Sequence, residues 1–146
     1  MHEVINNMKE VFGKFVSEYT RFQAIEDGIL IDVSDAAKET GITLPTAVTN
    51  TVWNDYIVVP EEMKGFQDER GRLHDLLWML YCAIKSKEIR GSQGFYKLIV
   101  AIPENNKWQS NEKRYGKDRR LVTLKSVCGP DDDGKAAITI MKPDQD

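Results

Sequence analysis

Hydrophobic residues recur at intervals of three and four more regularly between Asp68 and Gly91 than anywhere else in the chain. The apolar positions there are Leu73, Leu76, Leu77, Leu80, Tyr81 and Ile84. This spacing places them on one face of an α-helix. The Asp68 side chain can cap the first turn, and basic residues near the end suit the negative end of the helix dipole. We therefore predict a long amphipathic helix over about residues 68–88.

Shorter helices and one strand are predicted before this helix. Apolar spacing favours a peripheral N-terminal helix within residues 1–18, although the stretch after Gly13 fits an extended segment equally well. A capping-box pattern begins a helix at Thr20 that Gly28 can end, and residues 29–33 are typical of a strand. A helix follows over residues 35–40. Pro45 can open another helix, whose apolar face is Val48, Val52, Trp53 and Tyr56.

After residue 94 the pattern changes to the β-branched and aromatic residues that are typical of strands. Residues 95–102, 121–127 and 137–141 are predicted strands, and the turn cluster at 129–134 predicts an antiparallel hairpin. Residues 105–117 are polar and basic without periodicity, which predicts a flexible basic loop. Helices first and strands later indicate an α+β fold. We expect a single domain over residues 1–146, with an antiparallel sheet built mainly from C-terminal strands and packed against the long helix.

Composition narrows the function only modestly. The chain is 41% hydrophobic and 29% charged, and its net charge of −3 is too mild for bulk attraction to nucleic acid or for DNA mimicry. No apolar run approaches the roughly 20 residues that span a bilayer. The start of the chain lacks the pattern of a secretion signal. Cys82 and Cys128 are therefore expected to be reduced thiols of a cytoplasmic protein that does not bind membranes.

Residues that could form a catalytic or metal centre are sparse. The histidines are His2 and His74, and His74 lies about two turns, roughly 12 Å, from Cys82 on the predicted helix, too far for a nucleophile pair. These residues also lack a zinc spacing. The Asp131–Gly134 turn does not fit a calcium loop, because positions 129 and 140 would have to supply oxygen ligands. We predict no catalytic residue, no metal and no cofactor.

A basic stretch with interleaved aromatic residues is the strongest candidate for binding. Residues 107–125 carry seven lysines and arginines against two carboxylates, a net charge of +5 in a chain of −3. Such a segment can be a solvated loop, can contact a protein, or can bind phosphates and stack on bases. The candidate partner-binding residues are Lys107, Trp108, Lys113, Arg114, Tyr115, Lys117, Arg119 and Arg120, with Asp131, Asp132 and Asp133 as an acidic turn that could face a basic partner.

Several stretches, in order along most of the chain, resemble a family of short, uncharacterised bacterial proteins that plasmids and phages often carry. The stretches are Tyr19 to Ser34, Ala47 to Thr49 with Val52-Trp53, Gln67 to Met79, Val122 to Lys125, Cys128-Gly129-Pro130, and Ile138 to Met141. His74 stands where the resemblance leads us to expect an aromatic residue, which implies a packing position. The family has no established activity, so the resemblance implies no catalytic residues. The basic 105–117 segment is outside the pattern.

The resemblance implies a gene that travels on mobile elements, whose small proteins commonly bind a larger host machine. We therefore expect a non-catalytic module that binds a host or mobile-element protein, with inhibition of a host defence system such as CRISPR or restriction as one form. A nucleic-acid-binding accessory protein that uses residues 107–120 is the alternative. A third reading is an enzyme that uses carboxylates such as Asp27, Asp32, Glu69 or Asp75. The oligomeric state stays open.

Overall fold

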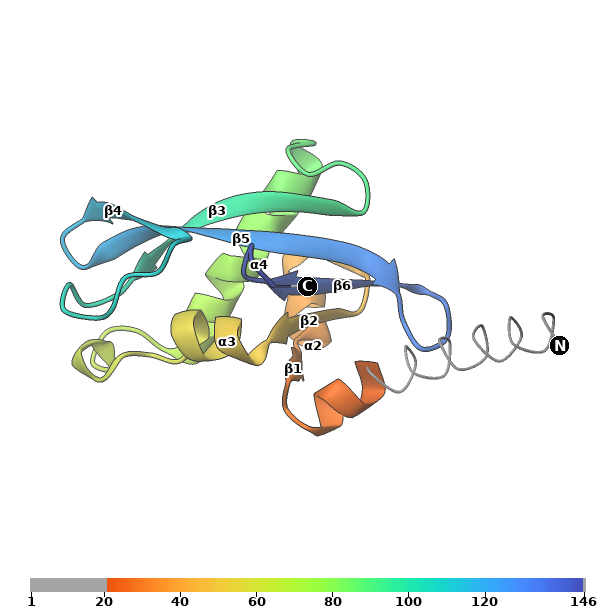
Figure 1. Cartoon of the computed structure of the whole chain (residues 1–146), viewed down its shortest axis with the longest axis horizontal. Helices are drawn as coiled ribbons and strands as arrows, with labels where there is room; N and C mark the ends of the chain where they lie inside the picture. The colour runs from red at the N-terminus through yellow and green to blue at the C-terminus, as the bar shows by residue number, and fades with distance from the viewer. Residues whose placement is uncertain (1–20, 146) are drawn as a thin grey trace, which may run out of the picture.

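The structure is a computed structural model that describes residues 21–145, so the helix predicted within residues 1–18 lies outside the described residues. Residues 21–26 are helical, and the later elements confirm an α+β fold (Figure 1). The elements are β1 (Leu30–Asp32), α2 (Ser34–Thr40), β2 (Thr46–Thr49), α3 (Asn50–Val52), the π-helical turn η1 (Trp53–Ile57), the 3-10 turn η2 (Glu61–Met63), α4 (Glu69–Lys85), β3 (Gln93–Ala101), β4 (Glu112–Gly116), β5 (Arg119–Pro130) and β6 (Ala136–Met141).

The six described strands form one mixed sheet rather than the antiparallel sheet that we expected. Their order is β1-β2-β6-β5-β3, and β4 pairs with the first part of β5 on the side away from β3. All pairs are antiparallel except β2 with β6, which run parallel. The predicted β5–β6 hairpin is confirmed. The long β5 runs across the middle of the sheet, and β3 forms its upper edge in Figure 1.

The segment after Pro45 is a strand, where we predicted the start of a helix. All of β2 is buried, and it pairs with β1 on one side and with β6 on the other. A short apolar run buried on both faces cannot be told from a buried helix by periodicity, and here the two flanking strands decide the outcome. The helical part begins only at Asn50, where the Thr49 hydroxyl accepts a hydrogen bond from the Val52 amide.

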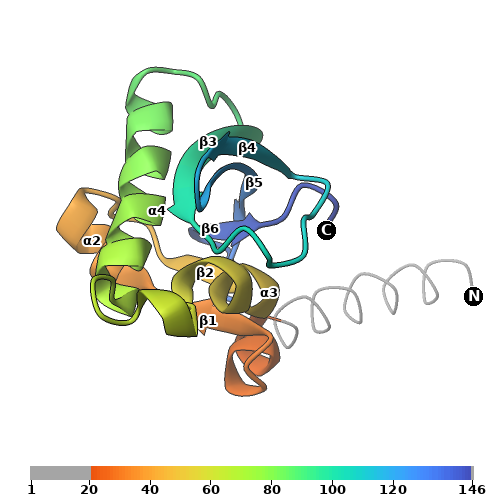
Figure 2. The same cartoon turned by 90° about the vertical axis from the view of Figure 1, so that its left-hand side faces the viewer.

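Helix α4 confirms the clearest prediction of the sequence. The Asp68 carboxylate accepts a hydrogen bond of 2.7 Å from the Gly71 amide and so caps the first turn. The buried side chains of α4 include Leu76, Leu77 and Leu80, which join one core cluster with the inward side chains of β3 and β5. Ile84 is exposed, so the buried stripe is narrower than predicted. Figure 2 shows α4 lying along one side of the curled sheet.

Residues 105–117 are not a continuous loop, because residues 112–116 form β4 and pair with β5. The sequence pattern hides this strand because the inward positions of β4, Glu112 and Arg114, are polar. Glu112 and Arg120 are buried there, at sites where periodicity arguments expect apolar residues. None of the described helices is long and apolar enough to cross a membrane.

Candidate functional site

The β4–β5 hairpin divides the predicted basic residues between two faces of the sheet. Arg114 pairs with Arg120 and Lys113 pairs with Leu121. Because successive strand residues point to opposite faces, the two arginines share the inner face and Lys113 lies on the outer face. The predicted set is therefore two groups with different surroundings.

On the inner face, Arg120 is fully enclosed, with 1% of its surface exposed. Its Nη1 donates to Glu112 Oε1 at 2.8 Å and to the Lys107 carbonyl at 2.9 Å. Its Nη2 donates to the carbonyls of Asn106 and Pro103, at 2.7 and 3.1 Å. The guanidinium group thus clamps the 103–109 loop onto the hairpin. We predicted Arg120 as a partner-contact residue, but its side chain is enclosed within the protein.

Trp108 covers this clamp from the outside. The Arg120 guanidinium carbon lies 3.7 Å from the centre of the indole ring, and that of Arg114 lies 5.8 Å away. Arg114 also forms a two-pronged ion pair with Glu104, with both contacts at 2.6 Å. One side of the Trp108 ring is therefore already occupied within the protein, which restricts its use as a platform for a base.

The buried carboxylate of Glu112 links the hairpin to the turn η1. Its Oε2 accepts a 2.5 Å hydrogen bond from the Tyr56 hydroxyl, which also accepts from Asn111 Nδ2 at 3.1 Å. Burial, followed by the hydrogen bond to Glu112, raises the pKa of Tyr56 well above its usual range. The phenol therefore stays protonated and keeps donating to the carboxylate throughout the physiological range.

The outer face of the sheet is turned away from α4 and toward the viewer in Figure 1. We call it the open face and define it by Phe95, Lys97, Ile99, Lys113, Arg119, Leu121 and Thr123, which alternate with the buried residues of β3 and β5. A cavity of about 290 Å³ lies in it. Lys97 and Lys113 line this cavity together with Leu121, Thr123, Ser110, Asn111, Pro143 and Asp144.

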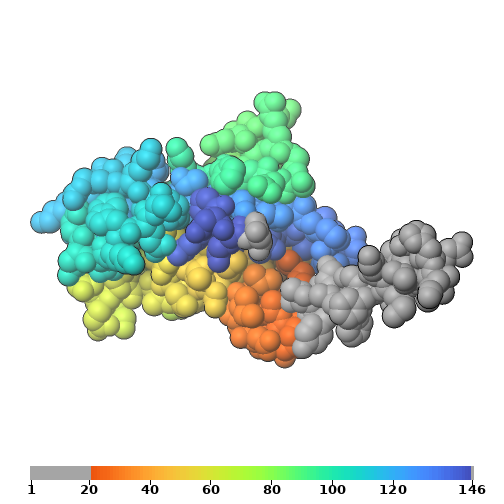
Figure 3. Space-filling model, in the orientation of Figure 1, coloured from red at the N-terminus to blue at the C-terminus, as the bar shows by residue number. Residues whose placement is uncertain are grey.

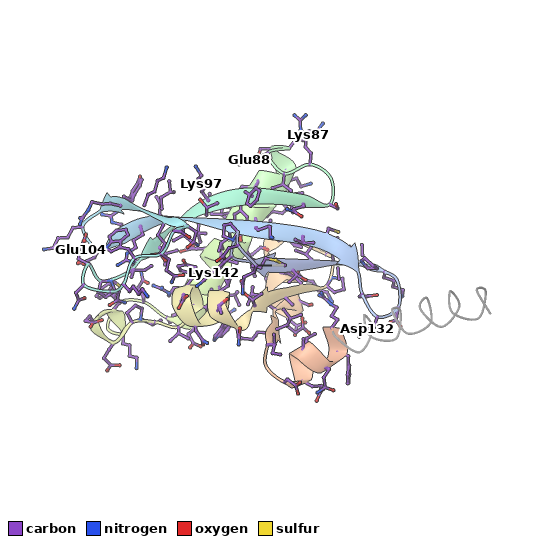
Figure 4. The ribbon with its side chains drawn as sticks, in the orientation of Figure 1. Lys87, Glu88, Lys97, Glu104, Asp132 and Lys142 are labelled. Atoms are coloured by element: carbon purple, nitrogen blue, oxygen red, sulfur yellow. The ribbon has the colours of Figure 1, made fainter. Side chains whose placement is uncertain are left out.

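The C-terminal segment forms one wall of the cavity because it folds back over the sheet. The ammonium group of the buried Lys125 donates to the Gln145 carbonyl. The Thr49 hydroxyl and the Lys142 amide both donate to the Gln145 side chain, at 3.0 and 2.8 Å. The Lys142 ammonium group contacts Asp55. Figure 3 shows this segment in dark blue at the centre of the face, and Figure 4 labels Lys142 there.

The open face combines exposed apolar side chains with positive charge. Phe95 and Ile99 are 49% and 43% exposed, and Lys97 stands between them on the same side of β3. Lys113 and Arg119 are exposed on the neighbouring strands, and Asp144 is the carboxylate at the cavity wall. Such a surface can bury apolar side chains of a ligand and pair with its carboxylates.

Lys107, Tyr115 and Lys117 are also exposed at this end of the molecule. Tyr115 lies at a β-bulge, where the β4–β5 register shifts. The acidic turn lies elsewhere, since Figure 4 places Asp132 at the opposite end from Glu104. The carboxylate of Asp131 holds that turn by accepting from the amides of Asp133 and Lys135, both at 2.9 Å. Asp133 is exposed. The structure does not bring the predicted basic and acidic sets together.

His74 occupies a different surface, on α4. It is exposed, and its ring stacks at 6.3 Å and within 6° of parallel on that of Trp78, which stacks in turn on Tyr81. The His74 Nδ1 atom is 3.8 Å from the Asp75 carboxylate, beyond hydrogen-bonding distance. The packing position implied by the resemblance is thus a stack at the surface.

The other candidates for chemistry are scattered. Asp27 accepts from Gln23 at the end of the first described helix, and Asp32 accepts from Ser34. Of the four carboxylates considered, Asp75 lines a groove of about 560 Å³ between α2 and α4. Both cysteines are free. Within residues 21–145, no three histidine, cysteine or acidic side chains are placed to hold a metal ion.

Sequence reasoning missed Phe95, Lys97 and Ile99 as part of the site. The signal was present, because Lys97 is the one charge inside the predicted strand 95–102. Both alternating sets of that strand are largely apolar, however, so the pattern does not tell which set faces outward.

The whole-chain comparison with known proteins points to one family. Residues 6–146 match a family described as "Family of unknown function (DUF6573)". No curated protein and no solved structure shows a significant match to the chain. Since the family match covers nearly all of the sequence, the chain belongs to this family of unknown function, DUF6573.

Proposed function

We propose that this protein is a non-catalytic module that binds an acidic surface of a larger protein through its open face. The observation that carries the proposal is the exposure of Phe95 and Ile99 on either side of Lys97, beside a cavity that Lys113 also lines. Exposed apolar side chains that gather on one face with polar residues around them commonly mark a binding surface. The surrounding cations select an acidic partner in a chain whose own net charge is −3.

The construction of the face supports this function. The clamp of Arg120 on the 103–109 loop and the bonds of Gln145 to Lys125 and Thr49 hold both borders of the face in place. A preformed surface loses less conformational entropy on binding than a mobile one. We expect Phe95 and Ile99 to contribute most of the affinity and the cations to set the partner's charge and the association rate.

The sequence resemblance supplies the biological setting of the proposal. It points to proteins carried by plasmids and phages, whose small products commonly act on a host assembly. Inhibition of a host defence complex is the specific form that we propose. An acidic patch on such a complex would be the target of the open face.

Nucleic-acid binding is the second candidate, favoured by exposed Tyr115 beside Lys113 and Arg119. Two observations make it the weaker reading. The Trp108 ring is already covered on one side by Arg120, and the Asp144 carboxylate lines the cavity, where it would repel a phosphate. Steep loss of affinity with rising salt would identify this mode.

The proposal is tested by affinity capture with the full-length tagged protein in lysate of its native host, with and without nuclease. The variant Lys113→Glu/Arg119→Glu should lose the captured partner. Lys38→Glu/Lys87→Glu makes the same change of charge at exposed positions outside the open face and should retain it. Capture that persists in the first variant contradicts the proposal. Capture that disappears with nuclease would instead indicate that the open face binds nucleic acid.

A further inference from the structure

Among the described strands, β3 lies at the end of the sheet order and so has a free edge. The hydrogen-bonding groups on that edge follow from the register of β3 with β5. The Ser92 carbonyl accepts from the Cys128 amide, and the Ile102 amide donates to the Asp118 carbonyl. Both pairs continue the β3–β5 register by one residue, one at each end. Hydrogen-bonded and non-hydrogen-bonded pairs alternate along an antiparallel ladder, so the even-numbered residues of β3 exchange the hydrogen bonds with β5. The amides and carbonyls of Phe95, Lys97 and Ile99 therefore point away from β5, at the end of the strand order.

The free edge ends at Ala101. Its carbonyl also points away from β5 and accepts a 2.9 Å hydrogen bond from Arg72 Nη1. Arg72 is buried, and its Nε donates to the Tyr56 carbonyl at 2.9 Å. Its Nη2 is buried without a partner among the described residues, and Arg72 lines a cavity of about 40 Å³ beside residues 98–101. Arg72 therefore closes this edge of β3 at Ala101.

The side chains along the edge define what such a strand should carry. Phe95, Lys97 and Ile99 lie on the open face, so a neighbouring strand would place every second side chain beside them. A carboxylate opposite Lys97, with apolar residues two positions before and after it, matches this row. Figure 4 shows Lys97 standing out from β3 at the upper edge of the sheet.

We propose that the partner binds by adding an extended segment to the free edge of β3 between Gln93 and Ile99, with an acidic residue opposite Lys97 and apolar residues flanking it. This inference rests on the proposed function and names the chemistry of its partner. A second copy of the chain fits less well, because a two-fold pairing centred on Lys97 sets two ammonium groups opposite each other.

The direct test uses a synthetic peptide, acetyl-Ser-Val-Thr-Glu-Thr-Val-Ser-amide, with the full-length protein and amide exchange followed by NMR. In the free protein the amides of Phe95, Lys97 and Ile99 should exchange quickly, while those of Tyr96 and Leu98 are protected. The peptide should slow exchange at the first three at least tenfold. The counterpart with Lys in place of Glu should bind about five-fold more weakly, because an attractive cross-strand pair becomes a repulsive one.

Two variants complete the test. Lys97→Glu should reverse the preference between the two peptides. Lys97→Pro removes the outward amide together with the ammonium group, so it should abolish binding of both peptides, whereas loss of the charge alone would weaken only the Glu peptide. Leu98→Pro removes a ladder amide and should unfold the sheet. If Lys97→Pro does not fold, the reversal by Lys97→Glu decides.

The proposal is overturned if the peptide binds without slowing amide exchange at residues 95, 97 and 99. It is also overturned if these amides are already protected from exchange in the free protein and sedimentation shows a dimer. A third outcome separates the two proposals. If Lys113→Glu/Arg119→Glu loses the host partner while both Lys97 variants still capture it, the edge proposal is overturned and the proposed function stands.

Discussion

Replacing Arg120 by methionine should be among the most damaging single changes in the described part of the chain. The substitution keeps an unbranched side chain but removes the guanidinium group. Glu112 then loses its buried cation, and the carbonyls of Pro103, Asn106 and Lys107 lose their donor. Breaking a buried pair by removing one partner costs about 3–5 kcal/mol. That is a large share of the roughly 5–15 kcal/mol by which a domain is stable.

The hairpin offers its own matched control. Arg114 pairs with Arg120 across the two strands and also binds a glutamate, Glu104. Its side chain is 63% exposed, and exposed ion pairs contribute only about 0–1 kcal/mol. Arg114→Met should therefore leave the unfolding free energy nearly unchanged. Both variants replace an arginine by methionine, and the two arginines differ in how deeply they are buried.

Urea denaturation at pH 7 measures both variants. With a slope of about 1–3 kcal/mol per molar urea, Arg120→Met should lower the midpoint by one molar or more, and Arg114→Met by a few tenths. Adding Glu112→Gln to Arg120→Met should cost less than the sum of the two single changes, because no unpaired charge remains. Equal midpoints for the two arginine variants, or strict additivity with Glu112→Gln, would refute the reasoning.

Three further predictions concern other parts of the fold. Gly41→Ala should cost about 1–3 kcal/mol in thermal or urea unfolding, because φ is 108° there and a Cβ would lie 2.9 Å from the Tyr81 ring, while Gly65→Ala, with nothing within 4 Å, should be nearly neutral. Burial raises the pKa of Tyr56 and Tyr96 in the folded protein, whereas an unfolded tyrosine has a pKa of about 10. The unfolding free energy should therefore be unaffected by these groups below about pH 10 and should fall above it, and the fall with pH should be less steep in Tyr56→Phe and Tyr96→Phe. Removing residues 142–146 leaves the buried lysine of β5 without its acceptor and should lower the unfolding free energy by about 1–3 kcal/mol.

The sequence predicts those parts of the fold that depend on local periodicity. The spacing of leucines from residue 73 and the cap at Asp68 locate α4 to within a few residues, and the turn cluster at 129–134 locates the β5–β6 hairpin. The strand β2 is not predicted because only its partners β1 and β6 distinguish it from a helix, and β6 is remote in sequence. The parallel pairing of β2 with β6 cannot be predicted for the same reason.

The candidate site is divided in the same way. Local charge identifies Lys113 and Arg119, which are exposed on the open face. It also selects Arg120, because a sequence shows charge and not burial. The carboxylate that pairs with this buried arginine belongs to Glu112, eight residues away on another strand. Glu112 is bound in turn by Tyr56, from a different part of the chain. The exposure of Phe95 depends on which face of β3 the helix α4 covers.

The most direct test of the open face as the binding surface is site-specific photo-crosslinking in the native host. The photoreactive residue benzoylphenylalanine replaces Phe95 in one variant and Lys113 in another, and a third carries it at Glu88, in the loop after α4 (Figure 4). We predict that the first two variants form a crosslink to the same acidic host protein and that the Glu88 variant does not. Crosslinking from Glu88 with none from Phe95 or Lys113 would contradict the account.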